Sequence, residues 1–353
     1  MSEFLSGRAR AIKPYTPGEQ NRGRSFIRLN TNESPFPPPN SVTDAIAETS
    51  ARLNVYSDPE ARELRRAIAD YHGVAPDCVT VGNGSDETLA FIVASFAGER
   101  GIAAADVTYS FYKTTASFFG VPYEEVRVRD DFSLDAEKFH ALDKLVMLAN
   151  PNAPTGLSVS NEAISRVAET NPDSVVVVDE AYADFAGFTA VPLTARHGNL
   201  IVVRTFSKSR FLAGARLGYS VSCPELAADL ERVRFAWNPY NVNAMTQAAG
   251  IAALSEDAYY RPRWREIANS RGYTKRELRR LGFFVTDSDA NFVFCRRDET
   301  PSAALYAKLR EAGILVRLLP GERTGGFLRI TIGAQGEAET LIGILEKICG
   351  GGL

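Results

Sequence analysis

The chain has 353 residues, of which 45% are hydrophobic and 24% are charged. These values are typical of a folded globular protein and exclude a disordered, collagenous or fibrous chain, and the length predicts about two domains. With 40 basic and 43 acidic side chains, the formal net charge is −3. We therefore expect no binding to nucleic acid or to an anionic membrane surface, and any bound anion must be recognised by a local group of side chains.

The spacing of cysteines and histidines argues against a metal centre. The four cysteines stand singly without a C-x-x-C pair, and the three histidines are far apart in the sequence. We predict no metal site and no His-centred triad, and we interpret the cysteines as reduced thiols of a cytoplasmic protein. The start of the chain lacks the apolar segment of a secretory signal, and no stretch reaches the roughly 18 apolar residues of a membrane span.

Two helices are predicted in the first hundred residues. In SDPEARELRRAIADYHG, apolar residues recur every three to four positions, as on one face of a helix. Ser57 or Asp58 can cap this helix and Pro59 suits its first turn, so we expect the helix to start there and to end at Gly73. A second helix is expected to begin after the segment GNGS.

Four short runs, GIAAA, LVMLA, SVVVV and LIVV, are apolar at almost every position. Strands with this pattern are buried on both faces, as in a parallel sheet that is covered by helices on both sides. The fold class is therefore predicted as α/β, with a large three-layer domain around a mostly parallel central sheet.

Near residue 256 the pattern changes to one long charged helix, followed by the short strand-like runs FFV, NFVFC, ILVR and FLRITIG. This order is typical of a smaller α+β domain. We predict a large domain over residues 31–255 and a small C-terminal domain over 256–353. Residues 1–30 are predicted to form an N-terminal arm that packs on the small domain or on a partner subunit.

Polar clusters follow two of the predicted strands, in VVVVDEAY and in TFSKSRFLAGARLGY. The carboxyl ends of parallel strands form the edge at which open α/β sheets bind ligands. Lys208 would lie there beside the Asp179 carboxylate, the Tyr182 phenol, hydroxyl groups and a guanidinium. Pyridoxal phosphate needs a lysine amine for its aldehyde, a carboxylate for its ring nitrogen and donors for its phosphate. Each residue alone is ordinary, but together they predict a pyridoxal-phosphate site.

A series of motifs along the chain is specific in combination. In chain order they are KPYTPG, LNTNESP, VYSDP, GNGSDE, VTYSFY, NPNAPTG, VVDEAY, TFSKSRFLAGARLGY, PYNVN and LRITIG. On these motifs the sequence resembles the pyridoxal-phosphate-dependent aminotransferases with the aspartate-aminotransferase-like fold, and within them the histidinol-phosphate aminotransferase family, over nearly its whole length. The resemblance implies pyridoxal 5′-phosphate as cofactor, an amino donor and a keto acid as substrates, and a homodimer with shared active sites.

The resemblance also implies roles for individual residues. The three predicted catalytic residues are Lys208, which would form the Schiff base, Asp179, which would pair with the pyridine nitrogen, and Tyr182, which would donate to ring atom O3′. The predicted phosphate cup consists of Thr205, Ser207, Arg216 and the backbone N–H groups of Ser85 and Asp86 at a helix N-terminus, where unpaired amides favour an anion. Tyr109 would stack on the cofactor ring, and Tyr56 would reach the cofactor phosphate of the partner subunit.

One departure from the family pattern is important. NPNAPTG has Ala153 where the family usually has an asparagine that donates to O3′. We expect Asn152 or water to supply this donor, or Tyr182 to act alone. Because a neutral hydrogen bond contributes about 0.5–1.5 kcal/mol, its loss would alter the cofactor's electronic properties more than abolish activity.

The strand-like run FLRITIG indicates a substrate anion site. Its apolar residues alternate onto one face, which directs Arg329 to the other face and, if the apolar face packs inward, toward the cleft. The resemblance implies that Arg329 and Arg317 hold the distal anion of the substrate, and two guanidinium groups can bind a phosphate monoester. Tyr15 and Asn32 are further substrate-binding candidates.

The expected function is transamination between histidinol phosphate and 2-oxoglutarate in histidine biosynthesis. Three alternatives stay open. A threonine-phosphate decarboxylase of cobalamin synthesis and an aromatic-amino-acid aminotransferase share the scaffold, the latter with Arg329 on an α-carboxylate. A non-catalytic binding protein could retain the fold, although a pure binder has no need of a Schiff-base lysine.

Overall fold

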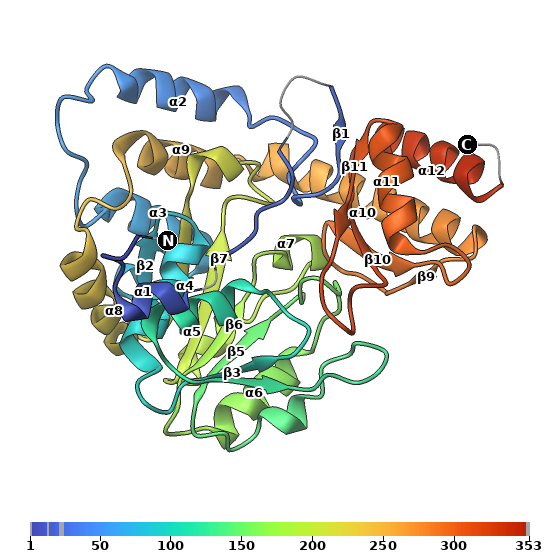
Figure 1. The fold of residues 1–353 in the computed structure, drawn as a ribbon. Coiled ribbons are helices and arrows are strands. Elements are labelled where there is room, and N and C mark those ends of the chain that lie inside the picture. The colour runs from blue at the N-terminus through green and yellow to red at the C-terminus, as the bar shows by residue number, and fades with distance from the viewer. Residues whose placement is uncertain (1, 13, 21–24, 351–353) are drawn as a thin grey trace.

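The computed structural model of the chain describes residues 2–12, 14–20 and 25–350. Its centre is a seven-stranded sheet in the order β2-β8-β7-β6-β5-β3-β4 (Figure 1). The strands are β2 (Val79–Gly82), β3 (Ile102–Ala105), β4 (Tyr123–Val126), β5 (Leu145–Ala149), β6 (Val176–Asp179), β7 (Leu200–Thr205) and β8 (Gly218–Val221). All pairs from β4 to β7 are parallel, whereas β8 is antiparallel to both of its neighbours. The predicted mostly parallel sheet is confirmed, with the four apolar runs as β3, β5, β6 and β7.

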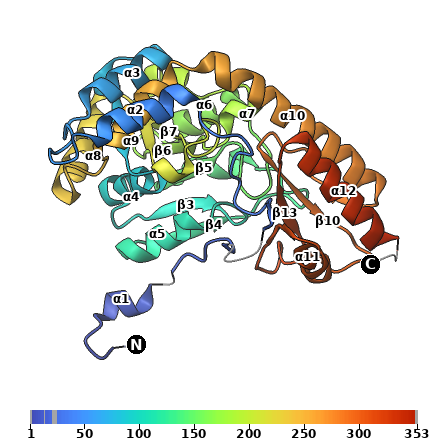
Figure 2. The ribbon, with the colours of Figure 1, turned by 90° about the horizontal axis from the view of Figure 1, so that it is seen from above.

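Helices cover both faces of this sheet and produce the expected three layers (Figure 2). Val177 of β6 packs with one helical layer, whereas Val176 and Val178 pack with the other, because successive side chains of a strand point to opposite faces. One layer contains α4 (Ser85–Phe96), α5 (Phe111–Phe119) and α8 (Pro224–Trp237). The other contains α3 (Arg62–His72), α6 (Asn161–Thr170), α7 (Ala183–Ala186) and α9 (Ala244–Leu254), with α2 (Asn40–Ser50) packed on α9.

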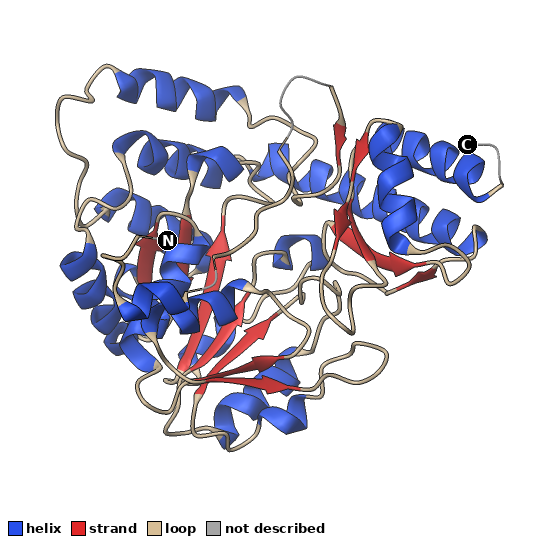
Figure 3. Cartoon of the chain, viewed as in Figure 1, coloured by secondary structure: helices blue, strands red, loops and turns tan. Residues whose placement is uncertain are grey.

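A second, antiparallel sheet has the order β12-β13-β10-β9. Its strands are β9 (Phe284–Val285), β10 (Phe292–Arg296), β12 (Arg317–Leu318) and β13 (Leu328–Thr331). The helices α10 (Asp257–Arg280), α11 (Ser302–Glu311) and α12 (Gln335–Cys349) pack around it (Figure 3). The predicted domain boundary near residue 255 falls directly before α10, which is the expected long charged helix.

The N-terminal arm joins the second sheet region. β1 (Ile27–Arg28) pairs in parallel with β11 (Ile314–Leu315), and the Glu19 carboxylate accepts hydrogen bonds from Tyr306 and Arg310 of α11. The short helix α1 (Gly7–Ala11) instead extends outward beside α5 (Figure 2). Residues 1, 13 and 21–24 of the predicted arm, and residues 351–353 of the predicted small domain, lie outside the described residues.

The start of α3 differs from the prediction. The helix begins at Arg62, not at Ser57 or Asp58 with Pro59 in its first turn. The Asp58 carboxylate accepts a hydrogen bond from the backbone N–H of Arg62 at 3.0 Å, which stabilises a separate turn ahead of the helix. The end of the helix is as predicted, because Gly73 adopts a left-handed φ of 68° there.

Short 3₁₀ helices lie in several connections of the described chain. They are Pro76–Cys78, Ala136–Phe139, Val191–Ala195 and Ala213–Ala215. All four cysteines are free thiols in the structure. Among the described residues, no helix combines the length and the apolar character needed to cross a lipid bilayer.

Candidate active site

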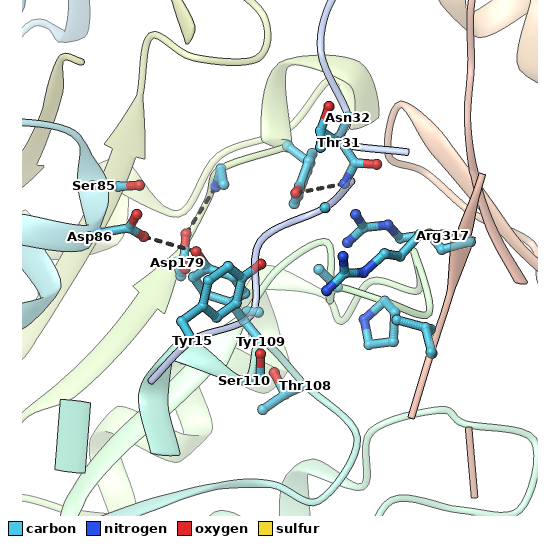
Figure 4. Close-up of a pocket in the computed structure, with 18 of the residues that line it drawn as sticks. Tyr15, Thr31, Asn32, Ser85, Asp86, Thr108, Tyr109, Ser110, Asp179 and Arg317 are labelled. Carbon is cyan, nitrogen blue, oxygen red and sulfur yellow. Dashed lines mark hydrogen bonds between the residues drawn. The ribbon is translucent and has the colours of Figure 1, made fainter. Parts of the chain in front are cut away.

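A cavity of about 770 Å³ opens at the carboxyl ends of β5, β6 and β7 and is bounded on the opposite side by residues of β12 and β13 (Figure 4). The predicted site residues that line it are Tyr15, Asn32, Ser85, Asp86, Tyr109, Asp179, Tyr182, Thr205, Ser207, Lys208, Arg216, Arg317 and Arg329. The fold therefore brings together residues from the N-terminal arm, the large sheet and the second sheet.

Asp179 is the last residue of β6 and is buried at the floor of the cavity. Its Oδ2 atom accepts a hydrogen bond from the Tyr112 hydroxyl at 2.7 Å, and its Oδ1 atom accepts one from the backbone N–H of Ala181 at 3.1 Å. Burial raises the pKa of the Asp179 carboxyl to about 6, although both donors lower it. A cationic ring nitrogen on the cavity side would favour the charged carboxylate, as the predicted pairing requires.

Tyr112 is a residue of the site that was not among the predicted ones. This tyrosine is buried in the first turn of α5 and comes three residues after Tyr109 in the quoted motif VTYSFY. The spacing of three residues between Tyr109 and Tyr112 could have indicated this role, since it brings both tyrosines to the same edge of the sheet. The bond to Asp179 joins residues 67 positions apart, which no local pattern indicates.

Lys208 follows β7 and enters the cavity from the same sheet edge. Its Nζ atom donates a hydrogen bond to the backbone carbonyl of Thr31 at 3.1 Å. Burial, and next the positive charge of the Arg329 guanidinium, lower the pKa of the Lys208 amine to about 8. At pH 7 about a tenth of such an amine is neutral, far more than for an ordinary lysine, which suits it to act as a nucleophile or a base.

The N-terminus of the 12-residue helix α4 forms one end of the cavity with Ser85 and Asp86. Gly84 caps this helix with a φ of 81°, and a Cβ atom there would lie 2.5 Å from an Arg216 nitrogen. A Cβ atom on Gly218 would lie 2.2 Å from the backbone nitrogen of Ser85. The two glycines therefore allow Arg216 and β8 to approach the free amides of the helix, and this arrangement suits a phosphate group.

The hydroxyl groups of Thr205 and Ser207 border the same end of the cavity. The Thr205 hydroxyl accepts a hydrogen bond from the backbone N–H of Ser207 at 3.1 Å and donates to the carbonyl of Leu217 at 3.3 Å. Both side chains are buried and line the cavity. They lie on the segment that also carries Lys208, so the amine and the anion-binding end are held by one stretch of backbone.

Two tyrosines form an aromatic wall of the cavity. The Tyr109 hydroxyl donates to Asp86 at 3.0 Å, and its ring makes an edge contact with Tyr15 at a centroid distance of 6.3 Å. Figure 4 shows the rings beside Asp179. Burial raises the pKa of the Tyr109 hydroxyl well above its ordinary value, so it stays protonated and acts as a donor. The wall offers aromatic surface against which a flat ring can pack.

Arg317 and Arg329 are direct cross-strand partners of β12 and β13, so their side chains leave the sheet on the same face. Arg317 donates to the carbonyls of Thr16 and Pro17, and Arg329 donates to the carbonyl of Asn30. Neither guanidinium is paired with a carboxylate of the described residues, and the buried Nε atom of Arg329 has no hydrogen-bond partner there. Burial and then the positive charge of Arg317 lower the pKa of Arg329. Two adjacent unpaired cations form a site for an anion.

The predicted role of Asn152 is not supported. Its amide nitrogen donates to the carbonyl of Val107 and the hydroxyl of Thr155, and its Oδ1 atom accepts a hydrogen bond from Thr108. Asn152 is buried in these contacts and does not line the cavity. Its polar atoms stabilise the loop after β5, so it does not supply the donor that is missing at Ala153.

Tyr56 also lies outside the cavity formed by this chain. Its side chain is 80% exposed, and its ring stacks on Tyr240 with centroids 4.4 Å apart. A contact with the cofactor of a partner subunit therefore stays a prediction for this residue.

The chemistry of the cavity fits pyridoxal phosphate. A lysine amine of lowered pKa, a buried carboxylate, an aromatic wall and a helix N-terminus flanked by an arginine match the aldehyde, the ring nitrogen, the ring and the phosphate of that cofactor. The profile of the family described as "Aminotransferase class I and II" matches residues 24–348, a range that holds every strand of both sheets. The chain belongs to this family of aminotransferases.

Individual relatives agree with this assignment. The aminotransferase is 43% identical over 349 residues to histidinol-phosphate aminotransferase 1 of Bradyrhizobium diazoefficiens, which covers 99% of this chain and 100% of that protein. It is 28% identical, with a TM-score of 0.89 and 99% of both chains covered, to the crystal structure of histidinol-phosphate aminotransferase from Sinorhizobium meliloti in complex with pyridoxal-5′-phosphate. A Thermus thermophilus aspartate aminotransferase tetra mutant shares the fold, with a TM-score of 0.82, 20% identity, and 98% and 100% coverage. Pyridoxal phosphate is the cofactor of this aminotransferase, so the predicted cofactor and enzyme class are confirmed.

The bond from Tyr112 to Asp179 provides a test of the cofactor end of the site. Tyr112→Phe removes a donor that stabilises the charged carboxylate, so we expect a half-reaction about tenfold slower or more, as for the loss of a hydrogen bond to a charged group. The loss should grow as the pH is lowered, because the pKa of Asp179 rises without its donor. Single-turnover rates measured across pH check this. Tyr260→Phe is the matched control, since Tyr260 is buried and its hydroxyl has no partner in the described chain.

Proposed function

We propose that this aminotransferase transfers an amino group from histidinol phosphate to 2-oxoglutarate, in histidine biosynthesis. The observation that carries the proposal is the pair of adjacent guanidinium groups, Arg317 and Arg329, which have no carboxylate partner in the described chain. Histidinol phosphate has a phosphate ester where the corresponding amino acid has a carboxylate, so the phosphate is its strong anion. The relatives named histidinol-phosphate aminotransferase, at about 40% identity over the full chain, support this substrate.

Lys208, Asp179 and Thr31 have separate roles in the proposed reaction. Bound pyridoxal phosphate supplies an aldehyde that takes up the amino group and a ring that withdraws electrons from the neighbouring carbon. Lys208 moves the proton of the carbon that carries the amino group, and its lowered pKa keeps a neutral amine available for this step. Asp179 holds the proton of the ring nitrogen by its negative charge. The carbonyl of Thr31 accepts a hydrogen bond from Lys208 and so holds the free amine in the cavity.

The anion site serves both substrates in this proposal. Arg317 and Arg329 bind the phosphate of the amino donor through charge-assisted hydrogen bonds, and they bind a carboxylate of the keto acid in the second half of the reaction. Tyr15 lines the same cavity as this pair, and the residues that follow it, Thr16 and Pro17, accept the Arg317 hydrogen bonds. A substrate ring beside Tyr15 and Tyr109 would be enclosed by the aromatic wall.

We also propose that the enzyme is a homodimer in the cytoplasm. An apolar surface supports a subunit contact, because Val55, Tyr56, Trp237 and Tyr240 are exposed, and Tyr56 stacks on Tyr240. The outward course of α1 fits an arm that packs on a neighbouring subunit (Figure 2). The free thiols of all four cysteines fit a reducing compartment.

The arginine pair gives the test of the proposed substrate. Arg329→Ala or Arg317→Ala should lower kcat/KM for histidinol phosphate by at least tens of fold, because truncating one partner of a desolvated charge pair costs about 2–5 kcal/mol. Unphosphorylated histidinol should be affected far less, since it has no phosphate to lose there. Steady-state kinetics with both donors check this, with Arg280→Ala as control, because Arg280 is exposed on α10 and paired with Glu277 and Glu346. Equal losses on both donors would mean that the pair supports the fold or the cofactor.

A further inference from the structure

Asn32 lies at the junction of the two sheets in an unusual conformation. It is buried, with a left-handed φ of 55° that asparagine tolerates better than most residues. Its backbone N–H donates to the Thr331 hydroxyl at 2.9 Å, and its carbonyl accepts a hydrogen bond from Asn291 at 3.1 Å. Both partners belong to the second sheet region, so Asn32 is fixed from that side independently of its side chain.

The side chain of Asn32 links this region to Tyr182. Its Oδ1 atom accepts a hydrogen bond from the Thr331 hydroxyl at 3.1 Å, which leaves the amide nitrogen directed at Tyr182. The amide donates to the Tyr182 hydroxyl at 2.9 Å (Figure 4). Since Thr331 also accepts the backbone N–H of Asn32, its single proton is used on Oδ1, and the amide orientation is set by the network.

This bond determines what the Tyr182 hydroxyl can do. Tyr182 is buried, and its ring packs at a right angle on Phe292, so the phenol has little freedom. The oxygen accepts from Asn32, and no described residue accepts its proton, which is therefore free for a group in the cavity. Ala153, in the loop that follows the neighbouring strand β5, lines the same cavity and offers it no side-chain donor.

We propose that Asn32 is a positioning residue whose amide holds the Tyr182 hydroxyl as a donor directed into the cofactor cavity, in place of a donor at position 153. Asn32 is a predicted substrate-binding residue, whereas its hydrogen bonds point to a role through Tyr182. The inference rests on the cofactor site of the proposed function and not on the identity of the amino donor. It also couples the second sheet region, through Thr331, to the electronic state of the cofactor.

The test is a double-mutant cycle between Asn32 and Tyr182 read in the resting, cofactor-loaded protein without substrate. In Asn32→Asp the carboxyl group can accept the Tyr182 proton and withdraw it from the cavity. Asn32→Gly removes the amide and keeps the left-handed backbone without strain. The readout is the pH midpoint of the visible absorption band, which rises when the ring oxygen of the cofactor loses a donor. We expect a rise of about one pH unit for Asn32→Asp and a smaller rise for Asn32→Gly.

In the Tyr182→Phe background Asn32→Gly should leave the midpoint unaltered, and Asn32→Asp should shift it no more than Asn30→Asp does, because the positioned hydroxyl is gone. Asn30→Asp is the matched control, since it adds a carboxyl two residues away without touching Tyr182; any shift it causes should persist in that background. Circular dichroism identifies which variants fold. If Asn32→Asp does not fold, Asn32→Gly decides the test. A folded Asn32 variant with an unshifted midpoint, or with the same shift when Tyr182 is absent, would overturn the proposal. Because no amino donor is present, this outcome is independent of the substrate assignment.

Discussion

Replacing Lys208 with alanine is expected to reduce amino transfer by about 10⁴-fold, the upper range for loss of a general acid–base residue. Lys208 lies in the cavity, and its amine donates a hydrogen bond to the Thr31 carbonyl. Burial lowers the pKa of this amine to about 8. The variant should still bind pyridoxal phosphate, because the anion-binding end at Ser85 and Arg216 is intact. Single-turnover kinetics and equilibrium binding of the cofactor check the two parts separately.

Covalent attachment of the cofactor gives the control for this prediction. In the wild-type protein, borohydride should fix the cofactor label on residue 208, as located by mass spectrometry, whereas Lys208→Ala should carry no label. The rate of attachment to the cofactor-free protein should rise with pH and level off above about 8, because the neutral amine is the nucleophile. A label on another lysine, or a variant that retains wild-type turnover, would show that Lys208 has been assigned wrongly.

Asp179→Asn should slow the half-reaction by about 10²–10³-fold, the usual effect of removing a preorganised electrostatic partner. The change preserves the size of the side chain. Its amide oxygen can accept from the Ala181 N–H and its NH₂ group can donate to the Tyr112 hydroxyl, so the fold should persist. Without the negative charge, the ring nitrogen of the cofactor no longer retains its proton. Asp179→Glu is the matched variant that keeps the charge, and its loss should be smaller. An unchanged single-turnover rate in Asp179→Asn would mean that the carboxylate only stabilises the turn at the end of β6 and has no role toward the cofactor.

The sheet and the residues at its edge could be predicted because they follow from local patterns. Runs that are apolar at nearly every position form strands buried on both faces, and β6 and β7 end where their sequences become polar. Asp179 and Lys208 were predicted from this change of character together with the chemistry that a cofactor needs. The family resemblance added the roles of individual residues, which composition and spacing alone did not indicate.

The remaining parts of the site depend on contacts between distant segments. Lys208 donates a hydrogen bond to a carbonyl that is 177 positions away in the sequence, and Asn32 donates one to Tyr182, 150 positions away. The pairing of Arg317 with Arg329 depends on the register of two short strands. Asn152 shows the same dependence, since the motif gives its position in the loop but not the three hydrogen bonds that turn its amide away from the cavity.

The most direct test of the account is the choice of amino donor by the wild-type enzyme. Loaded with pyridoxal phosphate, it is assayed with histidinol phosphate, phenylalanine and threonine phosphate, each with 2-oxoglutarate, and both glutamate and carbon dioxide are measured. We expect glutamate formation with histidinol phosphate at a kcat/KM about a hundredfold or more above that of the other donors, without carbon dioxide. Phenylalanine lacks the phosphate dianion, and threonine phosphate carries an additional α-carboxylate that would lose its water without gaining a partner. A higher kcat/KM with phenylalanine, or carbon dioxide released from threonine phosphate, would contradict the proposed function.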